Sequence, residues 1–187
     1  MVESFIELDK GLLLWIQNMG SPFWDPFWFF ITKKENSIPL YLFMLLISYR
    51  KLGRERFLYL LVFVALLITV SDQVTNLFKN GFMRLRPCHD PEMISLIRDL
   101  DYCGGKFSFF SGHASNSFAF ATFFIGVLVR YMPAVRWLLL WAFLMTFSRA
   151  YLGVHYPIDI ITGAFFGSFW ESFLRNYIAG ILLNKRI

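Results

Sequence analysis

Ionisable residues whose types and spacing could support nucleophilic or acid–base chemistry gather in three short segments of this 187-residue chain. In the last segment, His155 precedes Asp159 by about one helical turn if a helix begins at Pro157. A carboxylate that hydrogen-bonds one imidazole nitrogen fixes the tautomer of the ring and leaves the other nitrogen free to attack. We therefore predict that His155 is a nucleophile and that Asp159 orients it.

The second segment, Ser111-Gly112-His113, directly precedes an apolar stretch. Serine is a favoured helix N-cap, and the free N–H groups of a helix N-terminus bind phosphate. Glycine at the next position lets an anion approach the backbone closely. His113 would then stand in the first helical turn, beside any anion held there. Because a lone histidine at a helix start is more often structural, its assignment as an acid depends on the other two segments.

Three cations accompany the histidines. Lys79 shares one helix face with Asp72 and Asn76, at spacings of i, i+4 and i+7. Arg86 follows Lys79 in the next loop, and Arg149 ends another apolar run. Taken singly, such side chains are usually interfacial groups that reach toward water. If they lie at the same end of a helix bundle, they and the helix N-terminus predict a binding site for a phosphate group. A histidine at that site could attack the phosphorus.

The elements that must position these residues are hydrophobic. Hydrophobic residues make up 57% of the chain and 23 residues are phenylalanine, whereas only 17% are charged. A domain of this size cannot bury so much apolar area away from water. We therefore predict an all-α fold, a polytopic membrane helix bundle of five to six transmembrane helices with the active site at their outward-facing ends. The clearest apolar runs are 38–49, 57–70, 118–129, 137–147 and 158–174.

The N-terminal region leaves two alternatives open. Residues 5–16 are amphipathic, and the residues from Gly20 to Pro22 break any helix before an aromatic stretch. Residues 1–33 are therefore either one kinked spanning segment or two short helices at the membrane interface. No repeat or low-complexity tract divides the chain, so we predict a single integral membrane domain over residues 1–187.

Lysine and arginine predict the orientation of the bundle. If five spans alternate, three basic clusters fall on one side, which should be the cytoplasm together with the C-terminus. The polar loop 81–110 and the short loop near Tyr151 then face outward from a cell inner membrane. The net charge of +5 is largely this orientation signal, so we expect no nucleic-acid partner, only the lipid bilayer and an amphiphilic substrate. The clusters are Arg50, Lys51, Arg54 and Arg56; Arg130 and Arg136; and Lys185 and Arg186.

Both cysteines, Cys88 and Cys103, lie in the outward loop. In an oxidising compartment, a disulfide that closes a loop of about 15 residues would stabilise the fold by roughly 3 kcal/mol. The alternative is a pair of free thiols. We predict the disulfide, which would make the outward loop more rigid.

In their order and spacing, the three segments resemble the type 2 phosphatidic acid phosphatase superfamily, whose signature is K-x6-R-P, P-S-G-H and S-R-x5-H-x3-D. The resemblance covers residues 79–159, less than half of the chain. One position departs from the signature, because Phe110 stands where the family usually has proline; this affects the approach to the helix and not the catalytic atoms. The matching residues are Lys79, Arg86 and Pro87; Ser111, Gly112 and His113; and Ser148, Arg149, His155 and Asp159.

The resemblance implies a metal-independent phosphohistidine mechanism that needs no cofactor. His155 would attack the phosphorus while Asp159 steadies its ring, and His113 would protonate the leaving oxygen and later activate water. Few carboxylates converge near the site, which also argues against a magnesium ion. The expected phosphate-binding residues are Lys79, Arg86 and Arg149 through their side chains, and Ser111 and Gly112 through their N–H groups.

A site at the membrane surface favours an amphiphile whose tail lies in the lipid. Among lipid phosphates we rank undecaprenyl pyrophosphate first and phosphatidylglycerol phosphate second, with a lipid A phosphate or phosphatidic acid as the alternative. A lipid transporter or flippase is the alternative from another class, because charged residues within the membrane also mark transport paths. Transport does not readily explain a histidine–aspartate pair opposite a second histidine.

Overall fold

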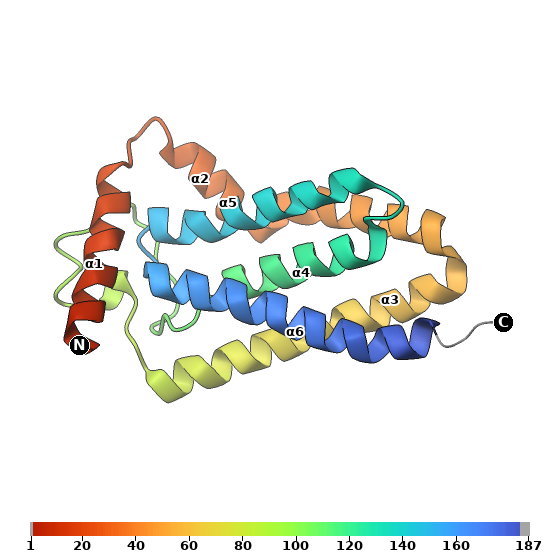
Figure 1. Ribbon diagram of the computed structural model, residues 1–187. Coiled ribbons are helices and arrows are strands. Elements are labelled where there is room, and N and C mark those ends of the chain that lie inside the picture. Colours follow the sequence, from red (N-terminus) through yellow and green to blue (C-terminus); the bar gives the residue numbers. More distant parts are fainter. Residues whose placement is uncertain (1, 184–187) are drawn as a thin grey trace.

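The computed structural model describes the backbone of residues 2–183 and the side chains of residues 3–173. This part of the chain is helical, and its only β-type pairing is an isolated bridge between Leu85 and Phe107. The all-α prediction is therefore confirmed. In chain order the elements are α1 (Val2–Asn18), α2 (Asp25–Thr32), η1 (Lys34–Ser37), α3 (Ile38–Phe82), η2 (Pro87–His89), α4 (Gly112–Leu128), η3 (Pro133–Trp137), α5 (Leu138–Tyr151) and α6 (Pro157–Leu183) (Figure 1).

The longest helix, α3, folds back on itself at Gly53 (Figure 1). Gly53 has a φ of +76°, a conformation that residues with a side chain rarely adopt, so glycine is needed where the two arms meet. The arms contain the predicted apolar runs 38–49 and 57–70. The other three runs overlap α4, α5 and α6, so each predicted run corresponds to one helical arm of the bundle.

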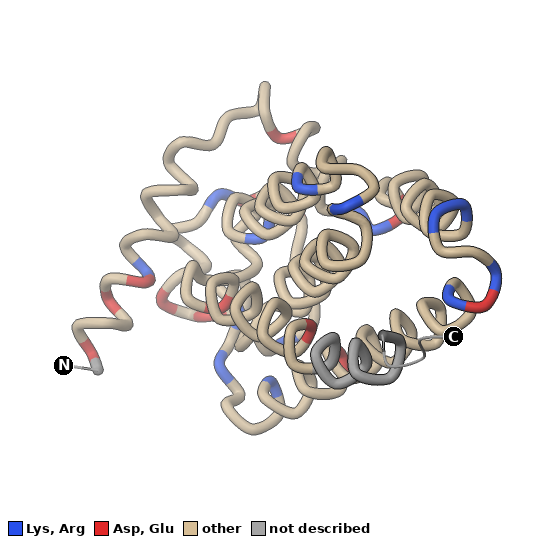
Figure 2. The backbone as a smooth tube through the Cα atoms, turned by 45° about the vertical axis from the view of Figure 1, so that its right-hand side comes forward, with Lys and Arg blue, Asp and Glu red and all other residues tan. Residues whose placement is uncertain are grey.

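The two ends of the bundle differ in their connections. The bend of α3 and the α4–α5 connection lie at one end, which we call the distal end (Figure 1). The loop after α3, the α5–α6 turn and α1 lie at the other, which we call the loop end. The first two basic clusters therefore lie together at the distal end, as the alternation of helices predicted, and Figure 2 shows the cluster at the bend. Lys185 and Arg186 lie outside the described residues.

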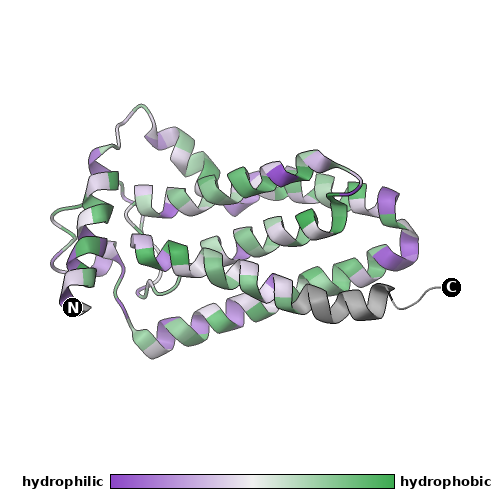
Figure 3. Ribbon diagram, in the orientation of Figure 1, coloured by the Kyte–Doolittle hydropathy of each residue, from purple (hydrophilic) through white to green (hydrophobic). Residues whose placement is uncertain are grey.

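Many large hydrophobic side chains of the described helices are exposed, and hydrophobic residues, green in Figure 3, occur along all of these helices. Within the described residues, the stretch Lys34–Phe82 is long and hydrophobic enough to cross a membrane by length and composition. The helix α5 has 14 residues, fewer than the roughly 20 of a full span, so the flanking turn η3 must contribute to any crossing. Outward-facing hydrophobic side chains suit contact with lipid; they include Leu42, Phe43, Leu46, Leu58, Val62, Leu66, Phe143, Phe165 and Phe169.

The N-terminal region forms two separate helices. A turn over residues 19–24, which contains the predicted break at Gly20 to Pro22, joins α1 to α2. The helix α1 crosses the loop end of the bundle (Figure 1) and buries Leu13 and Ile16 there, while α2 packs beside α5. Of the two alternatives for this region, the structure matches the pair of short helices.

Close contact between α4 and α6 brings the first turns of both helices together. A Cβ atom at Gly163 or Gly167 of α6 would collide with the backbone of Ser111 or Ser115 of α4. Glycines four residues apart lie on one helix face and let two helix backbones approach closely in a membrane. These two glycines therefore set the distance between the two helix starts that carry candidate catalytic residues.

Two buried clusters form the interior. The distal core lies between α3, α4 and α5 and is entirely hydrophobic; it includes Leu60, Phe63, Phe123, Phe124 and Leu128. The loop-end core joins α1, the loop after α3 and the facing ends of α4, α5 and α6; it includes Leu13, Met93, Ala114, Tyr151 and Tyr156. The loop-end core is thus assembled from segments far apart in the sequence.

Candidate active site

The three predicted segments meet at the loop end of the bundle. Lys79 lies in the last turns of α3, Ser111 caps α4, and His155 lies in the turn before α6. Burial and, after it, the positive charges of Arg86, Arg149 and Lys79 lower the pKa of His155. The fold therefore brings cations from separate helices and loops around one buried histidine.

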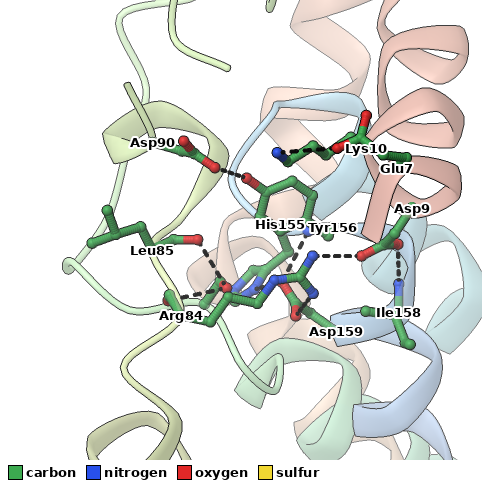
Figure 4. Close-up of polar contacts among 11 residues, drawn as sticks. Glu7, Asp9, Lys10, Arg84, Leu85, Asp90, His155, Tyr156, Ile158 and Asp159 are labelled. Atoms are coloured by element: carbon green, nitrogen blue, oxygen red, sulfur yellow. Dashed lines mark hydrogen bonds and ion pairs between the residues drawn. The ribbon is translucent and has the colours of Figure 1, made fainter. Parts of the chain in front are cut away.

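His155 is 1% exposed and lies beside Asp159 (Figure 4). Its Nδ1 atom is 3.6 Å from Asp159 Oδ2, which is longer than a hydrogen bond, and Nδ1 has no hydrogen-bond partner within the described residues. Asp159 instead accepts hydrogen bonds from Arg84 and from the N–H group of Tyr156, both at 2.9 Å. The pair is thus in contact without the hydrogen bond that we expected, and such bonds often shorten only in the complex with substrate.

Two buried guanidinium groups hold N–H donors without an acceptor in the described structure. Nη1 of Arg149 donates to Thr32 and to the hydroxyl of Tyr102, whereas its Nε has no partner among the described residues. Nε of Arg86 donates to the Phe107 carbonyl at 3.2 Å, whereas its Nη1 has no partner in the part of the chain that the structure describes. Burial and the charge of Arg149 lower the pKa of Arg86 to about 10, so Arg86 stays charged at neutral pH. Both groups are therefore suited to bind an anion such as phosphate.

Ser111 has the N-cap role that the sequence predicts, but its N–H group is engaged elsewhere. Its hydroxyl accepts a hydrogen bond from the N–H of Ala114 at 3.4 Å. Its own N–H donates to the main-chain carbonyl of Asp159 at 3.0 Å and so ties α4 to α6. Of the two N–H groups expected to bind phosphate, the one of Gly112 remains, because the first N–H groups of a helix have no partner inside it.

His113 lies in the first turn of α4 and borders a cavity of about 290 Å³ between α3, α4 and α5. Polar residues on the wall include Lys34, Asp72 and Asn116, and Asn116 donates to Asp72 at 2.8 Å. The rest of the wall is largely apolar, with Leu45, Val64, Leu67, Phe120, Phe123 and Phe124 among its residues. The cavity therefore extends from His113 at the loop end to side chains of the distal core, and its apolar wall suits the hydrocarbon part of an amphiphile.

The loop after α3 begins later than predicted. The helix continues through Gly81, and Met83, with a φ of +49°, donates its N–H to the Lys79 carbonyl at 3.0 Å. Met83 therefore takes the left-handed position at the helix end that glycine usually occupies. The loop covers residues 83–111 rather than 81–110, and Lys79 stays inside the helix.

A disulfide joins Cys88 to Cys103, whose Cα atoms are 6.1 Å apart. His89 lies beside the bridge, and these three residues are close enough together to suggest a metal site. Sulfur atoms in a disulfide are not thiolate ligands, so the cluster does not fit a metal ion. The bridge instead anchors Gly104, where a Cβ atom would collide with the guanidinium of Arg86. The disulfide-closed loop is therefore part of the wall around Arg86.

A polar clamp fastens the N-terminal helices to the end of α5. Arg98 donates to both carboxylate oxygens of Asp25, and Tyr151 donates to the same carboxylate at 2.8 Å. The Arg98 guanidinium is the main reason that the pKa of Asp25 lies below its ordinary value. Gln17 donates to the Tyr151 carbonyl and accepts from the Arg98 N–H, so α1 also holds this end of α5. These contacts brace the turn that leads to His155.

Sequence reasoning missed residues that hold the predicted ones in place. Arg84 bridges Asp159 and Asp9 (Figure 4). The sequence contained a signal for Arg84, because it lies two residues before Arg86. Alternate residues of an extended segment point to the same side. Asp9 and the partners of Arg149 come from other segments, and only the fold places them at the site.

Comparison with known proteins identifies similar sequences. The model of the PAP2 superfamily matches residues 56–180. A lipid A 4′-phosphatase of Bacteroides thetaiotaomicron is 39% identical over 179 residues, which cover 90% of this chain and 76% of that protein. A lipid A 4′-phosphatase of Porphyromonas gingivalis is 30% identical over 167 residues, which cover 87% of this chain and 69% of that protein.

Solved structures share the fold. The transmembrane PAP2-type phosphatidylglycerolphosphate phosphatase from Bacillus subtilis superposes with a TM-score of 0.75 at 20% identity, over 98% of this chain and 89% of that one. Aquifex aeolicus LpxE superposes with a TM-score of 0.67 at 25% identity, over 89% of this chain and 94% of that one. The helical bundle described above is therefore shared with membrane phosphatases.

Proposed function

The chain belongs to the PAP2 superfamily and is a phosphatase of lipid phosphates, and from this premise we propose that it removes the 4′-phosphate of lipid A. The two lipid A 4′-phosphatases support this substrate, because they match the chain over most of the length of both proteins. The resemblance to type 2 phosphatidic acid phosphatases, carried by three short segments, is confirmed.

This proposal changes the order of substrates that the sequence suggested. Undecaprenyl pyrophosphate and phosphatidylglycerol phosphate ranked first, whereas the similar sequences favour the alternative, a lipid A phosphate. The phosphatidylglycerolphosphate phosphatase from Bacillus subtilis shares the fold at an identity too low to carry its substrate over. Membership of a phosphatase family also favours hydrolysis over the transporter or flippase alternative.

One observation carries the mechanism: His155 is buried at the loop end, where the buried groups of Arg86 and Arg149 each have an N–H donor without an acceptor among the described residues. Because Nδ1 of His155 faces Asp159, Nε2 is the nitrogen that attacks the phosphorus. The N–P bond forms as the bond from phosphorus to the sugar oxygen breaks, and His113 gives a proton to that oxygen. Arg86 and Arg149 stabilise the negative charge on the non-bridging oxygens.

Hydrolysis of the phosphohistidine completes the cycle. Neutral His113 takes a proton from a water molecule, whose oxygen attacks the phosphorus while the N–P bond breaks. Inorganic phosphate leaves, and both histidines return to their starting states. Lys79 and the N–H group of Gly112 hold the phosphoryl oxygens during both steps. These groups stabilise the negative charge that develops on the oxygens.

The placement of charges supports an orientation in which the loop end faces away from the cytoplasm. The basic clusters within the described residues lie at the distal end, and positively charged loops usually stay in the cytoplasm. The disulfide lies at the loop end, and such bonds persist in oxidising compartments. In a cysteine-free background, a cysteine at Asp99 should react with an impermeant thiol reagent in intact cells, and a cysteine at Arg54 should not. The reverse pattern would refute this orientation.

A phosphate-release panel tests the substrate. Purified protein in detergent is given lipid A carrying both phosphates, undecaprenyl pyrophosphate, phosphatidylglycerol phosphate and phosphatidic acid. We expect the highest kcat/KM with lipid A, and mass spectrometry of the product should show that the 4′-phosphate is lost while the 1-phosphate stays. A higher kcat/KM with another lipid, or loss of the 1-phosphate, would refute the proposed substrate while leaving the phosphatase assignment intact.

The same panel is repeated with a chelator. Because Lys79, Arg86 and Arg149 supply the positive charge around the phosphate, we expect the rate to stay the same in excess EDTA. A rate that falls with EDTA and recovers with a divalent cation would contradict a mechanism carried by these side chains alone.

A further inference from the structure

Arg84 lies between two buried carboxylates that come from opposite ends of the chain (Figure 4). We propose that Asp9 and Arg84 are positioning residues for Asp159 and His155. The N-terminal helix α1 then contributes Asp9 to the active site. This inference rests on the roles proposed above for His155 and Asp159. It extends the site beyond residues 56–180, the part of the chain that matches the family model.

The guanidinium of Arg84 is held on its edge and on its face. Nη1 donates to Asp159 Oδ1 at 2.9 Å, and Nη2 donates to Asp9 Oδ2 at 2.7 Å. Its central carbon lies 3.9 Å from the centre of the Tyr156 ring, whose hydroxyl donates to Asp90 at 2.7 Å. A planar guanidinium can bridge two carboxylates and stack on an aromatic ring, which an ammonium group cannot do in the same way.

The contact with Arg84 decides which oxygen of Asp159 faces the nucleophile. Arg84 holds Oδ1, while Oδ2 accepts the N–H of Tyr156 at 2.9 Å and lies 3.6 Å from His155 Nδ1. With both oxygens held, the carboxylate cannot rotate away from the imidazole. Asp159 is fully buried, and a buried carboxylate without a cationic partner is costly. Arg84 therefore both orients this carboxylate and compensates its charge.

Asp9 links this arrangement to the start of α6. It is 5% exposed, and its second oxygen, Oδ1, accepts the N–H of Ile158 at 2.8 Å. Ile158 lies in the first turn of α6, whose N–H groups have no partner inside the helix. Asp9 thus caps the helix that carries Asp159 and anchors the arginine that holds Asp159. Both contacts come from α1.

A second ion pair of α1 provides a matched control. Lys10, the next residue, pairs with Glu92 in the outer loop, and it touches neither Asp159 nor His155. The pair joins the same helix to the same side of the molecule at an exposed site. Loss of helix docking alone should therefore appear in Lys10→Met as well as in Asp9→Asn, whereas loss of positioning should appear only in Asp9→Asn.

The test measures kcat and KM for phosphate release by the full chain in detergent, with the amount of phosphohistidine formed after rapid quenching. In Asp9→Asn and Arg84→Met we expect kcat to fall about 10- to 100-fold, as when an orienting partner of a functional histidine is lost, with KM changed far less. The amount of phosphohistidine formed in the first turnover should fall in parallel. Arg84→Lys should recover part of the lost kcat, and Lys10→Met should keep the wild-type kcat.

A double variant sharpens the test. Because Asp9 acts through Arg84, the kcat of Asp9→Asn with Arg84→Met should equal that of Arg84→Met alone. A wild-type kcat per folded molecule in Asp9→Asn would overturn the inference, as would losses that multiply in the double variant. The amide oxygen introduced by Asp9→Asn still accepts the Ile158 N–H, so this variant decides the question even if Arg84→Met does not fold. A wild-type chain that forms no phosphohistidine would instead overturn the proposed mechanism.

Discussion

The distal end and the loop end of the bundle are held together by different forces. The distal core consists of hydrophobic side chains from neighbouring helices, and polar side chains there, such as Ser48 and Thr122, bond to carbonyls within their own helices. At the loop end, polar contacts join segments far apart in the sequence, as between Asp9 and Arg84 or between Asp25 and Arg98. Hydrophobic packing therefore stabilises the distal end, whereas directional hydrogen bonds and ion pairs stabilise the loop end.

This difference predicts how substitutions at each end affect stability and catalysis. Hydrophobic packing is non-directional, so loss of one distal side chain should cost stability without moving a catalytic atom. Hydrogen bonds and buried ion pairs depend steeply on distance and angle, so a change at the loop end should alter chemistry. Each experiment below breaks one of the two ends, and they are arranged from the largest expected effect to the smallest.

The largest effect is expected when His155, the proposed nucleophile, is removed. His155→Ala should lower kcat by about a thousandfold or more, because no other group can form the covalent intermediate. Release of phosphate from lipid A measures this change. His89→Ala, at an exposed histidine on the outer loop, is the matched control and should keep the wild-type kcat. Substantial turnover by His155→Ala would exclude the phosphohistidine scheme.

The distal end should respond in stability instead of rate. Leu128 is fully buried in the distal core, and Leu128→Ala should lower the free energy of unfolding by about 2–5 kcal/mol. Thermal unfolding in detergent measures the loss, and kcat per folded molecule should stay at the wild-type value. Leu139, 43% exposed on α5, is the control, since Leu139→Ala should cost much less. A large fall in kcat for Leu128→Ala would show that the two ends are coupled.

The disulfide should matter at the loop end alone. Cys88 and Cys103 are 15 residues apart, and opening such a loop costs about 3 kcal/mol. Reduction should also loosen Gly104 from Arg86, so KM should rise more than kcat falls. Kinetics and thermal unfolding with and without reductant measure both effects. The double variant Cys88→Ser with Cys103→Ser should no longer respond to reductant; an unchanged response would point to another target.

The smallest effect is expected at the clamp between Asp25 and Arg98. Asp25→Asn should lower stability by about 1–3 kcal/mol, because it weakens a charge-assisted pair. The folded pKa of Asp25 lies below its ordinary value of 3.8, so the charged carboxylate stabilises the fold above that pH. This contribution disappears as the pH falls through the lowered pKa.

Thermal unfolding as a function of pH checks this prediction. The difference in Tm between wild type and Asp25→Asn should be constant near neutral pH and shrink once the pH falls below about 4. Asp99→Asn provides the control, because Asp99 is an exposed carboxylate next to Arg98 in the loop after α3. This variant should change Tm little at any pH. A difference that persists undiminished at the lowest pH where the protein stays folded would mean that packing, and not the charge of Asp25, stabilises this end.

Much of the bundle and of the site was predictable because local rules act on neighbouring residues. Apolar runs of helical length predict helices, and the five runs overlap the helical arms of the bundle. The N-cap at Ser111 follows from residue type, and so does the break between α1 and α2 near Pro22. The end of α3 was misplaced because Met83 adopts a conformation that composition does not reveal.

By itself, the sequence determined the helices, the basic clusters and the residue types at the site, since each depends on periodicity, charge or spacing along the chain. The tertiary structure alone decided which partners those residues have: Arg84 and the Tyr156 N–H beside Asp159, and the Asp159 carbonyl as acceptor for Ser111. The physical reason is that hydrogen bonds act over about 3 Å. A helix that shifts by less than the length of one residue can therefore exchange one hydrogen-bond partner for another. The approach of α6 to α4 at Gly163 and Gly167 sets that packing.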